Sequence, residues 1–405
     1  MIHSKIKLII LLCAISVISG CSNYYRNASN KHEISGTTYA SQSNFEMAKK
    51  EYQASVRLYP YNEPSKLALQ VINDLYAGKI SNETVCHLFK AGEYNEKRKF
   101  DQGLLEINKA ITGNPDYALG YYEKGRISLK VNDFDKAIAD FDTAIAKDPD
   151  LIWPYLGCSY AYFKKGDYEK AISNLDRATQ IDPNLPYLNY LTGIILSGQD
   201  KYDYAISSYN RAIKIDPLYA DAYSARGRAY CDIGGYKNAV SDFSKAIKLG
   251  QVTPYNYFYR GYAYLEIAAN GKNHTANFSA DPNNPFTQQV PDLSFTVPTQ
   301  HNLNPAVSDF TEAIRLDPKY YSCYVWRAFA YLGKKDIDQA MQDCNTAISI
   351  NPDHPAGYYM LAHCYLYKKD FDNAWKYLHE AENRHINRVN PIFLNDLKKA
   401  SGRDK

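Results

Sequence analysis

Small and bulky apolar residues recur along this chain at a fixed interval of thirty-four residues. When each unit is numbered from 1 to 34, position 8 is small, positions 20 and 27 are Ala or Gly, and position 24 is mostly bulky. The unit Ala118–Leu151 shows this in Gly125, Ala137, Phe141 and Ala144, and the units on either side repeat it. Self-similarity at such a period is typical of an array of stacked structural units.

The spacing of these positions predicts the structure of one unit. Positions 20, 24 and 27 are three or four residues apart, which places them on one face of an α-helix. Small residues let two helices approach closely, and bulky residues fill the space beside them. An Asp-Pro or Asn-Pro pair, such as Asp148-Pro149, follows the second half of most units. Because proline disfavours helical geometry in the residue before it, each unit is predicted to be a pair of antiparallel helices.

The pattern resembles that of the tetratricopeptide-repeat family, and the resemblance covers Thr84 to about Arg388. It implies an all-α fold, a right-handed superhelical solenoid of about eight helix-turn-helix units. It also implies a concave groove lined mainly by the first helix of each unit. A single unit cannot bury its apolar face alone, so helices that cap both ends are expected.

Breaks in the pattern indicate the domain organisation. Residues 44–83 are predicted to be degenerate N-terminal cap helices, since residues 44–60 match only the second half of a unit. The array spans residues 84–388, and residues 389–405 are predicted to be a C-terminal capping helix and tail. An insertion at 269–304 interrupts the sixth unit and is rich in Asn, Pro, Thr and Gln. Such a segment is either disordered or functional. The functional alternative is a flap over the groove that uses Phe278, Phe286 and Phe295.

The first residues are predicted to be a targeting segment. Residues 1–20 begin with Lys5 and Lys7 and continue with a short apolar run. They end in Ile18-Ser19-Gly20-Cys21, which resembles the lipobox of bacterial lipoproteins. The resemblance implies cleavage before Cys21 and acylation of Cys21. The alternative is an ordinary secretory signal with a chance cysteine. Ser22, in place of Asp, implies the outer membrane, facing the periplasm, in a Gram-negative bacterium.

A polar segment follows the proposed acylation site. Residues 21–43 are rich in Ser, Asn and Thr and show little periodicity. They are therefore predicted to be a flexible tether between the lipid and the repeats.

In the family, groove-facing residues lie near positions 2, 5, 9 and 12 of the first helix. These spacings define one helical face by periodicity alone. An aromatic and apolar stripe of this kind is typical of a partner-binding surface, because Tyr and Trp bring large, rigid contact area. The alternative for any one ring is packing between neighbouring units. The stripe consists of Trp153, Leu156, Tyr160, Phe163, Tyr187, Tyr190, Ile194, Tyr255, Phe258, Tyr262, Phe329 and Tyr359.

The net charge and the sequence motifs argue against several classes of function. The formal net charge is +3, and removal of Lys5 and Lys7 lowers it to about +1, which argues against nucleic acid as a partner. The segment that begins at His379 lacks the second His of a zinc-protease helix. The acidic pairs at Asp133 and Asp370 are interpreted as turn residues. No cofactor, metal site or catalytic site is predicted.

Six cysteines remain beyond the signal segment and its cleavage site. Their spacing is irregular, and most fall where small apolar residues fit, so they are interpreted as buried thiols. Cys344 and Cys364 lie on adjacent units and are the pair to examine for a disulfide. The six are Cys86, Cys158, Cys231, Cys323, Cys344 and Cys364.

Together these observations predict a non-enzymatic, lipid-anchored scaffold of the bacterial cell envelope. Such a scaffold would bind apolar segments of partner proteins in its groove. The resemblance implies help in assembling a pilus or secretion machine, or docking of cell-wall enzymes. Two alternatives stay open: a surface-exposed host-interaction factor, and an enzyme with an unrecognised site.

Overall fold

The computed structural model describes residues 28–59, 62–269, 302–384, 389 and 391–403. They divide into two units, here called the first unit (residues 1–199 and 211–218) and the second unit (residues 200–210 and 219–405). The predicted targeting segment and acylation site therefore lie outside the described residues, as do residues 270–301 of the insertion.

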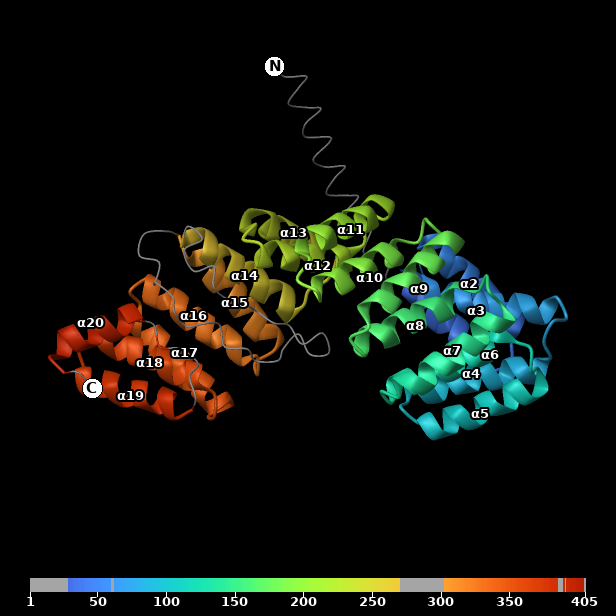
Figure 1. Ribbon diagram of the computed structural model, residues 1–405, viewed down its shortest axis with the longest axis horizontal. Helices are drawn as coiled ribbons and strands as arrows, with labels where there is room; N and C mark the ends of the chain where they lie inside the picture. Colours follow the sequence, from blue (N-terminus) through green and yellow to red (C-terminus); the bar gives the residue numbers. More distant parts are fainter. Residues whose placement is uncertain (1–27, 60–61, 270–301, 385–388, 390, 404–405) are drawn as a thin grey trace, which may run out of the picture. The chain divides into compact units, whose positions relative to one another are not determined.

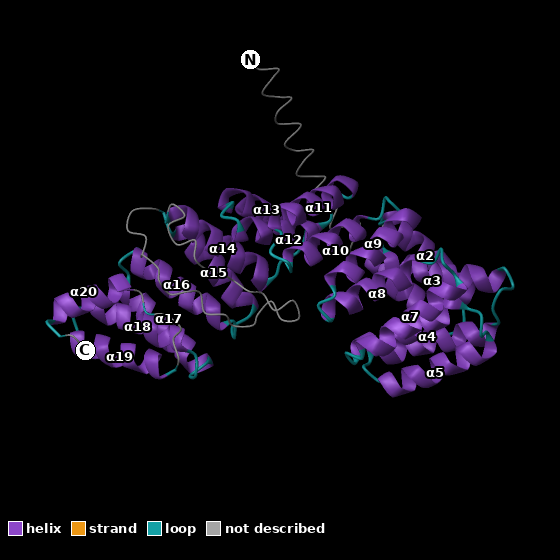
Figure 2. Cartoon of the chain, in the orientation of Figure 1, coloured by secondary structure: helices purple, strands orange, loops and turns teal. Residues whose placement is uncertain are grey.

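The described residues are helical and contain no strand, so the predicted fold class, an all-α repeat solenoid, is confirmed. Figure 2 shows the helices joined by short loops. After a first helix over residues 28–41, the chain order (Figure 1) is α2 (Phe45–Leu58), α3 (Glu63–Tyr76), α4 (Asn82–Glu96), α5 (Phe100–Gly113), α6 (Ala118–Lys130), α7 (Phe134–Lys147), α8 (Ile152–Lys164), α9 (Tyr168–Ile181), α10 (Pro186–Ser197), α11 (Tyr202–Ile215), α12 (Ala220–Asp232), α13 (Tyr236–Lys248), α14 (Pro254–Ala268), α15 (Asn304–Leu316), α16 (Tyr321–Gly333), α17 (Ile337–Ile350), α18 (Pro355–Tyr367), α19 (Phe371–Asn383) and α20 (Pro391–Ser401).

The small and bulky positions of the repeat form the core, as the spacing predicts. Ala137 and Ala144 are fully buried on α7, and Phe141 between them is fully buried too. A Cβ atom added at Gly125 or Gly157 would come within 2.6 or 2.5 Å of the Phe141 ring. The ring therefore fills the space that glycines leave on α6 and α8.

Local hydrogen bonds define where the helices begin. Asp133 and Asp370 are N-cap residues, and each accepts a hydrogen bond from the backbone N–H three residues later.

A tyrosine at position 4 of three repeats donates a hydrogen bond from its hydroxyl to the backbone carbonyl of the proline that ends the preceding repeat. These bonds are Tyr121 to Pro115 at 3.1 Å, Tyr155 to Pro149 at 3.0 Å and Tyr324 to Pro318 at 3.1 Å. Part of the tyrosine content therefore serves the joints between units.

The N-terminal end differs from the expected tether and half unit. Residues 28–41 are helical and pack on α2. Gly36 lies against the Tyr52 ring, and the Tyr52 hydroxyl and the Thr37 hydroxyl are 3.0 Å apart. The register explains this packing, because Gly36, Ala48 and Tyr52 occupy positions 8, 20 and 24 of one more unit. The helix was not predicted because residues 28–41 are rich in Ser, Asn and Thr, a composition that is typical of a flexible tether.

We expect Gly36→Val to lower the free energy of unfolding by about 1–3 kcal/mol, because the new side chain would overlap the Tyr52 ring. Gly92→Val is the matched control, since no atom lies within 4 Å of a Cβ added at Gly92. Urea unfolding followed by circular dichroism measures both variants. Equal stabilities of the two variants would contradict the packing of residues 28–41 on α2.

Helix α3 is an extra element between two regular helix pairs. The Asn62 side chain caps its first turn through Ser65 N–H at 3.0 Å. The Ser65 hydroxyl also donates to the Ser55 hydroxyl of α2 at 2.9 Å. Near its other end, Asp74 accepts a hydrogen bond from the Tyr117 hydroxyl at 3.0 Å. Both ends of α3 are thus fixed to the first unit.

An arginine–aspartate pair joins the two helices within three repeats of the second unit. Position 7 holds the arginine and position 23 the aspartate, so the repeat register carries the signal, although these pairs were not predicted. In each pair, two guanidinium N–H groups donate to the two carboxylate oxygens at 2.7 or 2.8 Å. The pairs are Arg226–Asp242, Arg260–Asp309 and Arg327–Asp343.

Helix α20 lies at the end of the second unit. Its Phe393 and Leu397 are buried, and the Trp375 indole N–H of α19 donates to the Ser401 hydroxyl at 3.1 Å. Among the helices described, none combines the length and apolarity needed to cross a bilayer.

Candidate partner-binding groove

The first unit contains a hollow of about 370 Å³ that includes four of the predicted groove residues. These are Trp153, Leu156, Tyr160 and Tyr187. We call this hollow the slot. Its described lining is Pro64, Leu67, Tyr122, Arg126, Leu129, Lys130, Phe141, Trp153, Leu156, Gly157, Tyr160, Tyr187 and Leu191.

First helices of three consecutive repeats, α6, α8 and α10, supply most of this lining. Tyr122, Arg126 and Leu129 occupy positions 5, 9 and 12 of their repeat. The periodicity that predicts Leu156 and Tyr160 at positions 5 and 9 could therefore have found them. The predicted stripe begins at Trp153 and therefore does not include them.

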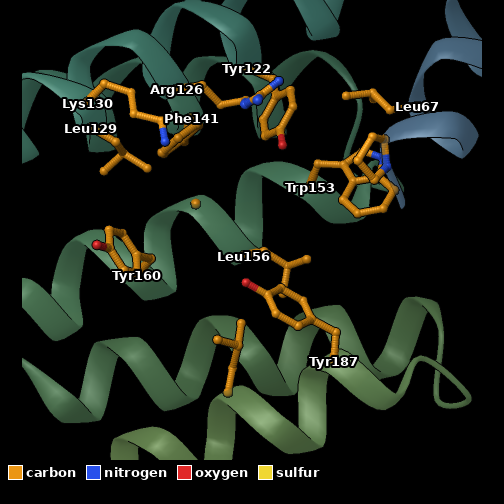
Figure 3. Close-up of a pocket in the computed structure, with 13 residues that line it drawn as sticks. Leu67, Tyr122, Arg126, Leu129, Lys130, Phe141, Trp153, Leu156, Tyr160 and Tyr187 are labelled. Atoms are coloured by element: carbon orange, nitrogen blue, oxygen red, sulfur yellow. The ribbon is translucent and has the colours of Figure 1, made fainter. Parts of the chain in front are cut away.

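Helix α3 supplies the part of the slot that the repeat pattern could not predict. Figure 3 shows Leu67 reaching toward Tyr122 and Trp153, with Lys130 and Tyr160 at the opposite end of the view. Pro64, one turn earlier, also lines the slot. Because α3 lies outside the thirty-four-residue register, no positional signal marks these two residues.

Cations lie on one side of the slot. Arg126 Nη1 bonds the two carboxylate oxygens of Glu123 at 2.7 and 3.0 Å, and this carboxylate raises the pKa of Arg126. The guanidinium also lies 5.8 Å from the Tyr122 ring centroid. Lys130, one turn further along α6, is exposed. The slot therefore combines an apolar, aromatic wall with two cationic side chains, of which Arg126 is paired with Glu123.

Three other predicted residues of the first unit lie near this face but do not line the slot. Phe163 packs against Tyr168, with ring centroids 5.9 Å apart. Tyr190 stacks on Tyr187 at 6.1 Å. Ile194 is partly buried on α10.

In the second unit the predicted stripe lies in the interior. Phe258, Tyr262, Phe329 and Tyr359 are at most 3% exposed, and Tyr255 is partly buried against Tyr259 at 4.5 Å between ring centroids. These side chains therefore contribute to the core of the second unit instead of an open face. The physical reason is ring-on-ring packing, seen in Phe258–Tyr320 at 5.2 Å, Tyr262–Trp326 at 5.2 Å and Tyr359–Phe393 at 5.3 Å.

His363, at groove position 9, is also internal. It is 8% exposed and stacks on Phe393, with ring centroids 3.9 Å apart. Burial lowers the pKa of His363 to about 3, so the imidazole is neutral at physiological pH. It packs against the last helix.

The described residues contain neither a disulfide nor a metal-binding cluster. The six cysteines examined above are free in the structure, and Cys344 and Cys364 are fully buried. Burial raises the pKa of the Cys344 thiol, which is in hydrogen-bond contact with Cys364. In the described ranges, no group of three or more His, Cys, Asp or Glu side chains is arranged to hold a metal ion.

Family models match the chain in both units. The description "TPR repeat" applies at residues 159–200 and 198–234. Models described as "Tetratricopeptide repeat" match residues 93–152, 321–354 and 355–383. The matches at 321 and 355 begin where α16 and α18 begin.

The chain is similar to several solved structures. The C-terminal part of a TPR repeat-containing protein from Cytophaga hutchinsonii is 19% identical, with a TM-score of 0.47 over 68% of this chain and 99% of that one. The pilF protein of Pseudomonas aeruginosa is 13% identical, with a TM-score of 0.48 over 62% and 99%. MamA of Desulfovibrio magneticus is 16% identical, with a TM-score of 0.37 over 42% and 97%. No curated protein matches the sequence.

Proposed function

Since this chain is a tetratricopeptide-repeat protein, we propose that it is a non-enzymatic, lipid-anchored scaffold of the bacterial cell envelope. Repeats of this family bind protein partners, and the matches in both units support a protein-interaction role. In this proposal Cys21 carries the lipid, and the protein faces the periplasm from the outer membrane.

The observation that carries the proposal is the slot. Trp153, Leu156 and Tyr187 line a concave surface on consecutive first helices. Tyr160, in the same lining, is 43% exposed. Aromatic side chains at such a surface are typical anchors for an apolar segment of a partner, because they bury large area with little loss of conformational entropy. A partner segment in the slot would thus be held by burial of its apolar side chains.

The proposed anchor would act through concentration. A lipid on Cys21 would hold the repeats near any partner in the same membrane, which raises the effective concentration of that partner. The protein would then help to assemble an envelope machine, or dock cell-wall enzymes, by binding its partners without catalysing a reaction. Insertion of the acyl chains into the bilayer would strengthen membrane binding by about 0.8 kcal/mol for each buried CH₂ group.

A photo-crosslinking amino acid placed at residue 160 tests the proposal in living cells. We expect one discrete adduct, since this position borders the slot. The same amino acid at Tyr204, which is 69% exposed and does not line the slot, is the matched control. Diffuse labelling of equal strength from both positions would contradict a partner-binding slot. Cys21→Ser tests the anchor, since it should release the protein from the membrane fraction and reduce the adduct.

A further inference from the structure

We propose that the slot recognises a partner segment in which a carboxylate lies beside a large apolar side chain. The inference rests on the proposed function and adds the chemistry of the partner. It depends on which side chains line the slot, how α3 limits its size and how α6 orients its charges.

The apolar part of the partner follows from the aromatic wall. Trp153, Leu156, Tyr187 and Leu191 come from α8 and α10, and Leu67 of α3 lies beside Trp153 in the lining. The slot volume of about 370 Å³ is near the lower end of the roughly 300–1,000 Å³ found for small-ligand sites. It therefore fits one large side chain and its neighbours better than a whole helix.

The size limit is built into the fold because α3 is fixed at both ends. Asp74 bonds the Tyr117 hydroxyl at 3.0 Å and the Lys79 ammonium at 2.9 Å. Asn62, at the other end, donates to the Glu33 carboxylate at 2.9 Å and to the Ser29 hydroxyl at 3.1 Å. Leu67 therefore has a fixed position in the wall of the slot, and it limits the size of the side chain that can bind there.

The charge preference follows from the rest of the lining. Of the described residues that line the slot, Arg126 and Lys130 are positive and none is negative. They are four residues apart on α6, which places them on one face of the helix. Both bonds from Arg126 to Glu123 use Nη1, which leaves Nε and Nη2 for a ligand. A planar guanidinium held in this way suits a carboxylate, and Lys130 adds a second charge.

Three fluorescein-labelled heptapeptides test this chemistry with the purified full chain. They share Gly and Ser flanks and a central Phe, and differ only in the next residue, which is Glu, Gln or Lys. Fluorescence anisotropy measures each dissociation constant. We expect the Glu peptide to bind at least about tenfold more tightly than the Lys peptide, with the difference shrinking as salt screens the charges.

Two variants assign the effect to the slot. Lys130→Glu should abolish or reverse the preference for the Glu peptide. Lys136→Glu makes the same charge change at a 78% exposed side chain of α7 that does not line the slot, and should leave the preference unchanged. Leu67→Trp should fill the slot and weaken binding of all three peptides, while circular dichroism reports whether each variant is folded.

Equal binding of the three peptides, a preference for Lys, or no binding up to about 1 mM would overturn the inference. The cellular crosslink from residue 160 distinguishes this result from failure of the proposed function. A discrete adduct there, together with peptides that do not discriminate, would leave the scaffold intact and remove only the carboxylate preference.

Discussion

Asp309→Ala is expected to lower the free energy of unfolding of the second unit by about 3 kcal/mol. The substitution removes both carboxylate acceptors of the Arg260 guanidinium, which lie at 2.7 and 2.8 Å, and leaves its bond to the Ser244 hydroxyl at 3.0 Å. The two side chains are only 19% and 6% exposed, so the arginine would stay largely buried without its partner. A buried charge that loses its partner costs much more than a surface pair contributes.

Two further variants separate pairing from packing. Arg260→Met combined with Asp309→Leu should recover most of the loss, because an apolar pair of similar volume avoids the desolvation of two charges. Arg315→Ala breaks an exposed pair with Glu312 and should cost less than about 1 kcal/mol. Urea unfolding in a Trp153→Phe background reports on the second unit, because the remaining tryptophans, Trp326 and Trp375, both lie there. A loss at Asp309 no larger than that at Arg315 would contradict the buried pair.

Glu266→Gln is expected to stabilise the second unit at pH 8 by about 3 kcal/mol. Glu266 is 1% exposed, and its Oε2 atom has no hydrogen-bond partner among the described residues. Burial raises the pKa of Glu266 from 4.5 to about 7, although a hydrogen bond from Tyr262 opposes the shift. The folded state therefore holds a proton that the unfolded chain releases above pH 4.5. The contribution of Glu266 to the free energy of unfolding therefore falls as the pH rises from 4.5 to 7, and it stays low above pH 7.

The neutral glutamine removes this titration, so the gain from Glu266→Gln should disappear near pH 4.5, where glutamate is largely protonated in the folded state. The comparison must be made between variant and parent at each pH. His363, with its pKa lowered to about 3 by burial, destabilises the same unit as the pH falls below 6.5. That effect is common to both proteins and cancels in the difference. A gain that is constant from pH 4.5 to 8 would mean that Glu266 does not titrate as described.

Much of the fold could be predicted because its signals are local. Helix pairs follow from small and bulky residues such as Ala137 and Phe141 at helical spacing, and from the proline that ends most repeats. The helix over residues 28–41 was missed because its polar composition outweighs its single glycine at position 8, although Gly36 and Tyr52 do fit the register. Composition describes the average of a segment, whereas packing depends on the residue at one position.

The candidate site was predicted only in part. Trp153 and Tyr187 line the slot, whereas Tyr359 occupies an equivalent face and is 1% exposed. Periodicity identifies the face of a helix on which a ring lies. Whether another element covers that face depends on contacts between residues distant in sequence, as when Phe393 of α20 packs on Tyr359.

The sequence by itself determined the repeating helix pairs, because the spacing of small, bulky and helix-ending residues acts within one unit and its neighbour. Only the tertiary structure decided that Leu67 of α3 closes the slot and that Phe258 and its neighbours are core. Those outcomes depend on the packing of helices that no fixed spacing relates, so they arise only when the chain is folded.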